Sequence, residues 1–174
     1  DGALVVNRES DSVNQISFRT LNTHRGSIGA NSAACFTVYN SSSAERLRIT
    51  NAGHVGINTV PSSWESGADT TALQIDGASV ACINDTDFFA TSNAYWDGSN
   101  WKRIQTGAAV NYNQINRVHT FRSSASGSPG SNVSWTNQLV IDVAGNVNIT
   151  GITTANQLFE GSSRVATAGK AVAM

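Results

Sequence analysis

The sequence predicts an all-β protein of short antiparallel strands, with little or no helix. Ser, Thr, Asn, Ala and Gly are abundant, whereas 13% of the residues are charged and the lysines are only Lys102 and Lys170. Long helices depend on Leu, Glu, Lys, Gln and Arg, so this composition disfavours them. Runs of β-branched and aromatic residues alternate instead with polar turn sequences, which is typical of short strands joined by tight turns.

Short strands are expected throughout the first part of the chain. The runs with apolar, β-branched or alternating character are residues 3–6, 15–19, 27–29 and 35–39. Turn-forming residues follow the later runs, with a cluster of Asn and Ser at residues 40–43. Alternation with period two predicts strands that bury one face.

A β-hairpin is predicted over residues 47–57 (LRITNAGHVGI). Leu47 and Ile49 lie on one side of the first strand, and Arg48 lies on the other. The Asn-Ala-Gly sequence supplies the reversal, because Gly53 adopts a positive φ at no steric cost. The next predicted strands span residues 73–75 and 79–83.

The clearest hairpin signal lies at residues 95–102 (YWDGSNWK), where Asp-Gly separates two aromatic strands. Residues 118–121 alternate again, and residues 123–131 are expected to form a flexible polar loop. Residues 138–149 predict a final hairpin, after which the pattern weakens.

An internal repeat links two of these hairpins. Residues 47–57 align without gaps on residues 139–149 (LVIDVAGNVNI), and Leu, Ile, Ala, Gly, Val and Ile recur at the same places. We interpret this as one hairpin used twice, with apolar positions facing a core and Ala-Gly forming the turn. Two copies do not make a solenoid, which needs three or more stacked units.

Charge and hydropathy exclude several classes of protein. The net charge is -1, and no basic cluster of the kind that binds nucleic acid is present. The longest apolar run is too short to span a bilayer, and no signal peptide is visible, so we expect no membrane insertion. Cys35 and Cys82 lie in mixed apolar contexts, and we expect two reduced, buried thiols rather than a disulfide or a metal pair.

Residues 45–64 (ERLRITNAGHVGINTVPSSW) resemble an element that is common in bacteriophage tail fibres and tailspikes, especially those of marine phages. The matching residues are Arg46, Leu47, Arg48, Ile49, Thr50, Gly53, Val55, Gly56, Ile57, Thr59 and Pro61. Asn58 stands where that family usually has Gly. Residues 95–114 and 139–151 also resemble recurring stretches of these proteins, so the resemblance extends from about Gln15 to Gly151.

The resemblance implies an elongated, intertwined homotrimer built from β-sandwich or β-prism-like units. We expect an N-terminal, shaft-like β unit over residues 1–62, a second β unit over 63–151 that could form a receptor-binding knob, and a connector over 152–174. The expected partners are two further copies of the chain, a host surface glycan or protein, and other virion tail proteins. The expected location is the virion tail fibre, after synthesis in the bacterial cytoplasm.

Aromatic side chains are the candidate ligand-binding residues. Tyr95, Trp96 and Trp101 flank one hairpin, and exposed aromatic rings there could stack on sugars of a surface polysaccharide. The alternative is that they fill a core or a trimer axis, which is the commoner fate of large aromatic residues. Trp64 and Trp135 are expected to be packing residues.

No catalytic or cofactor site is predicted. Asp85 and Asp87 could form a carboxylate pair of a glycosidase, but an exposed polar loop or a calcium-like cluster of oxygen atoms explains them equally well. The histidines are scattered, so no metal site is predicted, and His54 on the repeated hairpin is a weak candidate for an ion on a trimer axis. The Ser-rich sequence contains no nucleophile elbow and no phosphate loop.

These observations lead to one expected function and two alternatives. We expect a trimeric, non-catalytic segment of a virion tail fibre that mediates attachment to the host cell surface. One alternative is a tailspike module that degrades polysaccharide. The other is a purely structural shaft of a fibre or of a trimeric adhesin.

Overall fold

The computed structural model confirms that the chain is all-β. It describes residues 16–30, 36–67, 69–151, 157–160 and 163–167, and no helix forms among them. The strand predicted at residues 3–6 and the side chain of Cys35 lie outside the described residues. The strands are β1 (Ile16–Thr20), β2 (Thr23–Ala30), β3 (Phe36–Asn40), β4 (Glu45–Ile49), β5 (Val55–Ile57), β6 (Thr70–Ile75), β7 (Ala78–Ile83), β8 (Asp87–Ser92), β9 (Ala94–Trp96), β10 (Trp101–Arg103), β11 (Gly107–Ile115), β12 (Val118–Gly127), β13 (Thr136–Ile141), β14 (Val147–Ile149), β15 (Gln157–Glu160) and β16 (Ser163–Thr167).

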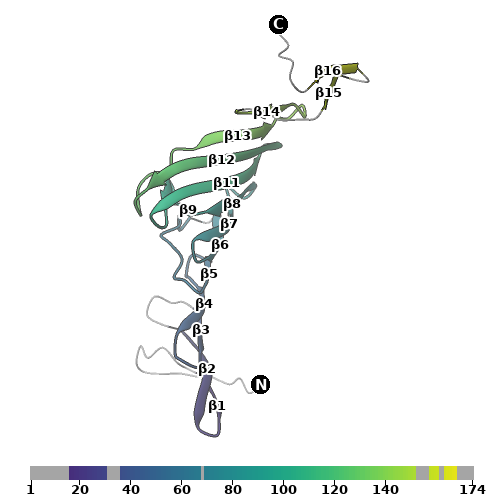
Figure 1. Cartoon of the computed structure of the whole chain (residues 1–174). Helices are drawn as coiled ribbons and strands as arrows, with labels where there is room; N and C mark the ends of the chain where they lie inside the picture. The colour runs from purple at the N-terminus through teal and green to yellow at the C-terminus, as the bar shows by residue number, and fades with distance from the viewer. Residues whose placement is uncertain (1–15, 31–35, 68, 152–156, 161–162, 168–174) are drawn as a thin grey trace, which may run out of the picture.

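One 12-stranded sheet forms the body of the molecule. Its strand order is β1-β2-β3-β4-β5-β6-β7-β8-β11-β12-β13-β14, so spatial neighbours are almost always sequence neighbours. Figure 1 shows the strands following one another along the long axis of the molecule, from β1 at one end to β14 at the other. Two small antiparallel pairs, β9 with β10 and β15 with β16, stand outside this sheet. The sheet is continuous across the boundary expected near residue 62.

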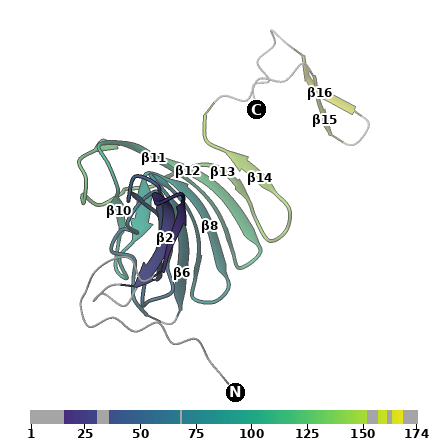
Figure 2. The ribbon, with the colours of Figure 1, turned by 90° about the horizontal axis from the view of Figure 1, so that it is seen from below.

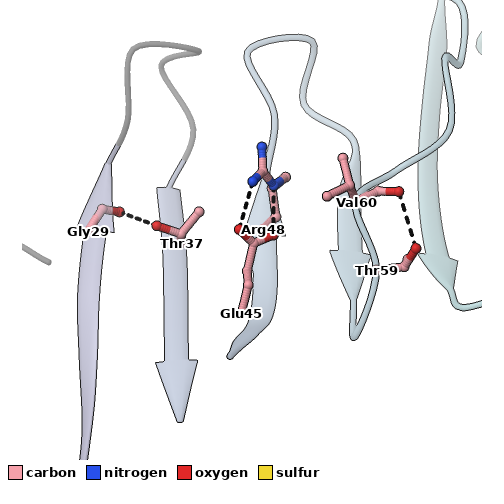
Figure 3. Close-up of polar contacts among 6 residues, drawn as sticks. All are labelled: Gly29, Thr37, Glu45, Arg48, Thr59 and Val60. Carbon is pink, nitrogen blue, oxygen red and sulfur yellow. Dashed lines mark hydrogen bonds and ion pairs between the residues drawn. The ribbon is translucent and has the colours of Figure 1, made fainter. Parts of the chain in front are cut away.

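Polar side chains make hydrogen bonds between β2 and β3 and within β4 in the N-terminal part of the sheet (Figure 3). The hydroxyl of Thr37 on β3 donates to the carbonyl oxygen of Gly29 on β2 over 3.0 Å. On β4, the Arg48 guanidinium donates to both carboxylate oxygens of Glu45, at 2.7 and 2.6 Å. Arg48 pairs across the strands with the buried residues Thr37 and Gly56, so it lies on the face opposite to its apolar neighbours on β4, as the alternation predicts.

The sheet contains one parallel pair, formed by β5 and β6. Parallel neighbours cannot be joined by a tight turn, so the chain must cross one face of the sheet between them. The crossing passes directly over β5, where a Cβ on Gly56 would lie 2.3 Å from the Thr59 carbonyl oxygen and 2.7 Å from Pro61 Cδ. Position 56 therefore has room for Gly alone.

The buried amide of Gln74 fixes the far end of this crossing. Gln74 Oε1 accepts from the backbone N–H of Ser62 over 2.9 Å and from Trp64 Nε1 over 3.0 Å. Gln74 Nε2 donates to the carbonyl oxygen of Asp76 over 2.8 Å. Gln74 is 1% exposed, and these bonds satisfy both polar atoms of its amide. Its bond to Nε1 orients the Trp64 ring into the core.

The repeated sequence forms the same hairpin twice. In β4 and β5, Leu47 pairs with Ile57 and Ile49 with Val55. In β13 and β14, the equivalent residues pair in the same register, Leu139 with Ile149 and Ile141 with Val147. Both turns have a glycine at positive φ, 83° at Gly53 and 85° at Gly145. The predicted hairpin repeat is confirmed, but its apolar positions do not face a core as expected, since Ile49, Ile57 and Ile149 are 39%, 37% and 43% exposed.

An aromatic core covers one face of the sheet. It is formed by residues from the crossing, from β6 to β8, from β11 and from the β9–β10 pair: Trp64, Ala72, Ala81, Ile83, Phe89, Ala94, Trp101 and Ala109. Trp135 packs against this cluster from the segment before β13. Trp64 and Trp135 are thus packing residues, as predicted.

Arg103 holds the segment after β12 against this core. It is 5% exposed, and its five N–H groups donate to the carbonyl oxygens of Gly107, Ala125 and Asn132 and to the hydroxyls of Ser124 and Ser131. A buried guanidinium is costly unless all its donors are satisfied. Here neutral oxygen atoms take the place of a carboxylate partner.

Two predictions from sequence were wrong at this end of the sheet. Residues 123–127 belong to β12 rather than to a flexible loop, because they pair with β11 in the register Val110 to Ser123 and Gly107 to Gly127. Strands β8 and β11 were not predicted. Polar residues such as Asn111 and Asn113 are buried on β11, so its alternation does not follow hydrophobicity.

Gly56→Ala tests the crossing. We expect a loss of about 2–3 kcal/mol in the free energy of unfolding, because the backbone at Thr59 must move to make room for the methyl group. Gly145→Ala is the control, since its Cβ would meet nothing within 4 Å and only the positive φ costs about 1 kcal/mol. Equal losses in urea unfolding would contradict the close approach.

Arg103→Met tests the hydrogen-bonded guanidinium. We expect a loss of about 3 kcal/mol in the free energy of unfolding, because buried oxygen acceptors lose their donors. The adjacent Lys102→Ala is the control, with a loss below about 1 kcal/mol, since Lys102 makes only surface contacts, with Asn132 Oδ1 at 2.6 Å and with Asp97 at 3.7 Å. Denaturant unfolding of both variants gives the comparison, and an unchanged Arg103→Met would refute the role of Arg103.

Candidate functional site

The predicted aromatic hairpin forms, and it places its rings toward the sheet. β9 and β10 pair with Trp101 opposite Trp96 and Lys102 opposite Tyr95. Asp97 makes the turn, where its carboxylate accepts from the backbone N–H groups of Ser99 and Asn100 at 2.8 and 2.6 Å. The aromatic residues are thereby held on the inner side of a short, well-bonded hairpin.

Trp101 is the centre of the aromatic core. Its ring contacts Phe89 with centroids 5.0 Å apart, Trp96 at 5.9 Å, Trp135 at 6.1 Å and Trp64 at 6.3 Å. With 9% of its surface exposed, Trp101 has no free ring face of the kind on which a sugar stacks. The structure places it among packing residues.

Tyr95 and Trp96 are half-buried on the same hairpin. The Tyr95 ring meets Trp64 edge-on, with centroids 6.1 Å apart. Both residues pack against the core while part of each stays at the surface. Glycan stacking by this hairpin stays a prediction. Because Trp101 is buried, only Tyr95 and Trp96 remain as candidates for it.

His54 is buried beside the crossing. It is 3% exposed, its Nε2 lies 2.9 Å from the carbonyl oxygen of Glu65, and its ring lies 6.4 Å from that of Trp64. Within the described part of the chain, no three His, Cys, Asp or Glu side chains gather as ligands of a metal ion. His54 thus contributes to the same core as Trp64.

The two predicted carboxylates lie at an exposed turn. Asp85 follows Asn84 in the β7–β8 connection, and both adopt positive φ, 61° and 53°. Asp87 begins β8, where its carboxylate accepts from the Asn84 amide at 3.4 Å and the Thr86 hydroxyl at 3.4 Å. The positive φ of Asp85 and the hydrogen bonds of Asp87 are those of a tight turn.

The opposite face of the sheet carries a second, larger feature. Residues that pair directly across neighbouring strands place their side chains on the same face, so the registers define rows that run across the strands. The central row is apolar from β2 to β14: Ala30, Phe36, Ile49, Val55, Leu73, Val80, Ala90, Tyr112, Phe121, Leu139 and Ile149.

Two further rows flank the central row. The second row consists of Ile16, Ile28, Val38, Leu47, Ile57, Ile75, Ala78, Ser92, Val110 and Ser123. The third row consists of Thr71, Cys82, Phe88, Gln114, His119, Ile141 and Val147. We call these three rows together the apolar face.

No described residue covers the apolar face, and its rows are uncharged. Its rows contain no Asp, Glu, Lys or Arg. Among the large apolar residues that the structure shows as exposed, Leu21, Val60 and Val143 lie outside strands and Phe18 lies on β1 outside the three rows; the others belong to the rows, for example Val80 at 45% and Val110 at 52%. So large an exposed apolar surface is typical of an interaction site.

A hollow of about 630 Å³ lies on this face between β6 and β12. Its floor includes the small residues Ala78 and Ala90, and larger side chains such as Leu73, Val110 and Phe121 border it. Figure 2 shows how the strands fan out in this part of the sheet.

Cys82 corrects one prediction from sequence. It was expected to be buried, but it is an exposed free thiol. It lies in the third row, opposite Thr71 on β6 and Phe88 on β8, so its side chain points to the uncovered face. The apolar context of Cys82 is real, but no described part of this chain covers it.

The apolar face is the feature that reading the sequence strand by strand did not identify. Each strand shows its alternation, but alternation does not say which apolar side meets the core and which stays bare. In β7, for example, Ala81 is buried while its larger neighbour Val80 is exposed. The exact registers were needed to join the separate apolar positions into rows.

Comparisons with known proteins give no family for this chain. No family model matches it, and neither a curated protein nor a solved structure does so. None of the described residues belongs to a helix that could cross a membrane.

The turn at Asp97 predicts a pH dependence. Backbone N–H groups of Asn100 and then Ser99 lower the pKa of Asp97 below its ordinary value of 3.8. The charged carboxylate therefore stabilises the hairpin above pH 3.8, and this stabilisation is lost as the pH falls through the lower folded pKa. Asp97→Asn should lower the melting temperature at neutral pH and match the wild type in acid; a difference that is independent of pH would contradict this origin.

Proposed function

We propose that this chain is a non-catalytic segment of a bacteriophage tail fibre or tailspike that assembles as a homotrimer and helps to attach the virion to its host. Its ligand would be a glycan or protein of the host surface, and its other partners would be tail proteins of the virion. The proposal joins the resemblance of residues 45–64, 95–114 and 139–151 to the architecture described above.

The observation that carries the proposal is the uncharged apolar face, which follows the long axis of the sheet. Eleven strands at a spacing of about 4.8 Å give the central row a length of about 50 Å. An enzyme buries its apolar residues around a site, whereas a fibre segment needs an association surface along its whole length. The repeated hairpin adds to this reading, because it recurs as structure and carries no chemistry of its own.

A trimer also explains how weak surface contacts could hold a virion. Three identical sites on one rigid body raise the effective concentration of each site after the first has bound. The half-buried Tyr95 and Trp96 lie on the face away from the apolar rows, so they would remain outside such an assembly. They are the residues through which we propose contact with a glycan.

Solution mass and ligand binding together test the proposal. We expect light scattering on a sizing column to give a trimer, and we expect that trimer to bind an array of bacterial surface polysaccharides. Trp96→Ala should weaken binding to the array by about 1–3 kcal/mol, the range measured for ring stacking on other flat ligands, while the trimer persists. Trp135→Phe is the control at a packing position.

Other outcomes identify the alternatives. Release of reducing ends from a polysaccharide, abolished in Asp85→Asn or Asp87→Asn, would establish a degrading tailspike module. A stable trimer that binds no cells and no polysaccharide would leave a structural shaft or an adhesin stalk. A monomer at all concentrations would overturn the proposed assembly.

A further inference from the structure

We infer that the apolar face is the surface through which copies of this chain pack on one another, in parallel and in register, around an axis that runs along the rows. The inference rests on the proposed function, and it names the partner and the residues of the contact. The partner is a second copy of this chain, and the central row lies nearest to the axis.

The size of the face matches a partner of the same length. Its central row is about 50 Å long, and three rows about 7 Å apart give a width of 15–20 Å, so the face offers roughly 800 Å². A stable protein interface buries about 800 Å² on each partner. A small apolar ligand could occupy the hollow, but it would leave the row from Phe36 to Val55 exposed.

The absence of charge is what contact between identical copies requires. In a cyclic assembly each residue near the axis meets the same residue of its neighbours, so any charged residue would meet its own like charge. Arg48 of β4 avoids this arrangement, because it lies on the opposite face and pairs with Glu45 at 2.6 Å. The three rows leave no such repulsion at any height.

The order of residues along the rows favours parallel packing. Polar residues of the rows are concentrated in the C-terminal half: Ser92 and Ser123 in the second row, and Gln114 and His119 in the third row. The N-terminal strands instead present Ile and Phe side chains. Parallel, in-register packing places polar residues against polar ones and apolar against apolar, whereas antiparallel packing would set Gln114 and His119 against Ile and Phe side chains.

One contact near the middle of the face shows that its polar atoms are already arranged within each copy. The Tyr112 hydroxyl lies 2.8 Å from His119 Nδ1 and accepts from Gln114 Nε2 over 2.8 Å. The Tyr112 ring also stacks on Phe121 with centroids 4.6 Å apart. These side chains can therefore enter an interface without losing their hydrogen bonds.

Val80→Lys tests whether the face makes the contact. Val80 is 45% exposed in the single chain, so the substitution should leave its strands folded while it places like charges on the axis. We expect the dissociation constant of the assembly to rise more than about 100-fold. Val143→Lys is the matched control, because Val143 is 55% exposed but lies in the β13–β14 turn; it should leave the mass unchanged.

Spin labels test the direction of packing. Single cysteines replace Ile49, Val80 or Ile149 of the central row in a background of Cys35→Ser and Cys82→Ser, and electron–electron distances are measured within the assembly. Sheets packed face to face lie about 10 Å apart, so parallel copies give short distances at all three positions. Antiparallel copies give a short distance near the middle of the row and long distances at its ends, which would overturn the inference.

The two proposals fail in different ways. If the chain is a trimer that binds glycans, but Val80→Lys is a trimer too and the labels are far apart, the inference is wrong and the fibre function stands. If the labels are close but neither polysaccharide nor cells bind, the packing stands and the attachment function fails. A monomer overturns both proposals.

Discussion

The parallel pairing of β5 with β6 is the constraint on which the rest of the structure depends. It obliges the chain to cross a face of the sheet, and this crossing carries Trp64 into the core. Gly56 leaves the room for the chain to pass, and Gln74 fixes where it arrives. Because the crossing and the β9–β10 pair lie on the same face, that face acquires a core and the other one stays bare. The connection between β5 and β6 thus determines which face of the sheet is covered and which face is exposed.

The repeat shows how the same local sequence serves two different neighbours. The hairpins share register, turn geometry and apolar positions, but Gly56 of the first corresponds to Asn148 of the second. That difference has a physical cause, because the crossing covers Gly56, whereas Asn148 is exposed. The local pattern therefore determines the hairpin, and the difference between Gly56 and Asn148 reflects what packs upon each copy.

Much of the fold could be predicted from local signals. The hairpins at residues 47–57, 95–102 and 138–149 combine alternation with a turn residue that accepts positive φ, and all three form. β11 was missed, because it buries Asn111 and Asn113, two polar side chains that hydrogen-bond to each other where apolar residues would be expected. The arrangement around Arg103 was hidden for the same reason, since its partners are oxygen atoms of distant loops. The candidate binding hairpin was found, but only tertiary structure could show that Trp101 is its buried member.

The shared register of the two repeated hairpins has a consequence for how such a chain can change in length. Leu47 and Leu139 occupy equivalent positions in their hairpins, on the same side of the sheet. Recombination in the gene between the two repeats would therefore join β4 directly to β14. The shorter product, or the longer one with the intervening strands duplicated, would keep every apolar residue on its original side. The repeats are therefore points at which recombination would add or remove whole blocks of sheet while the register of the joining hairpin is kept.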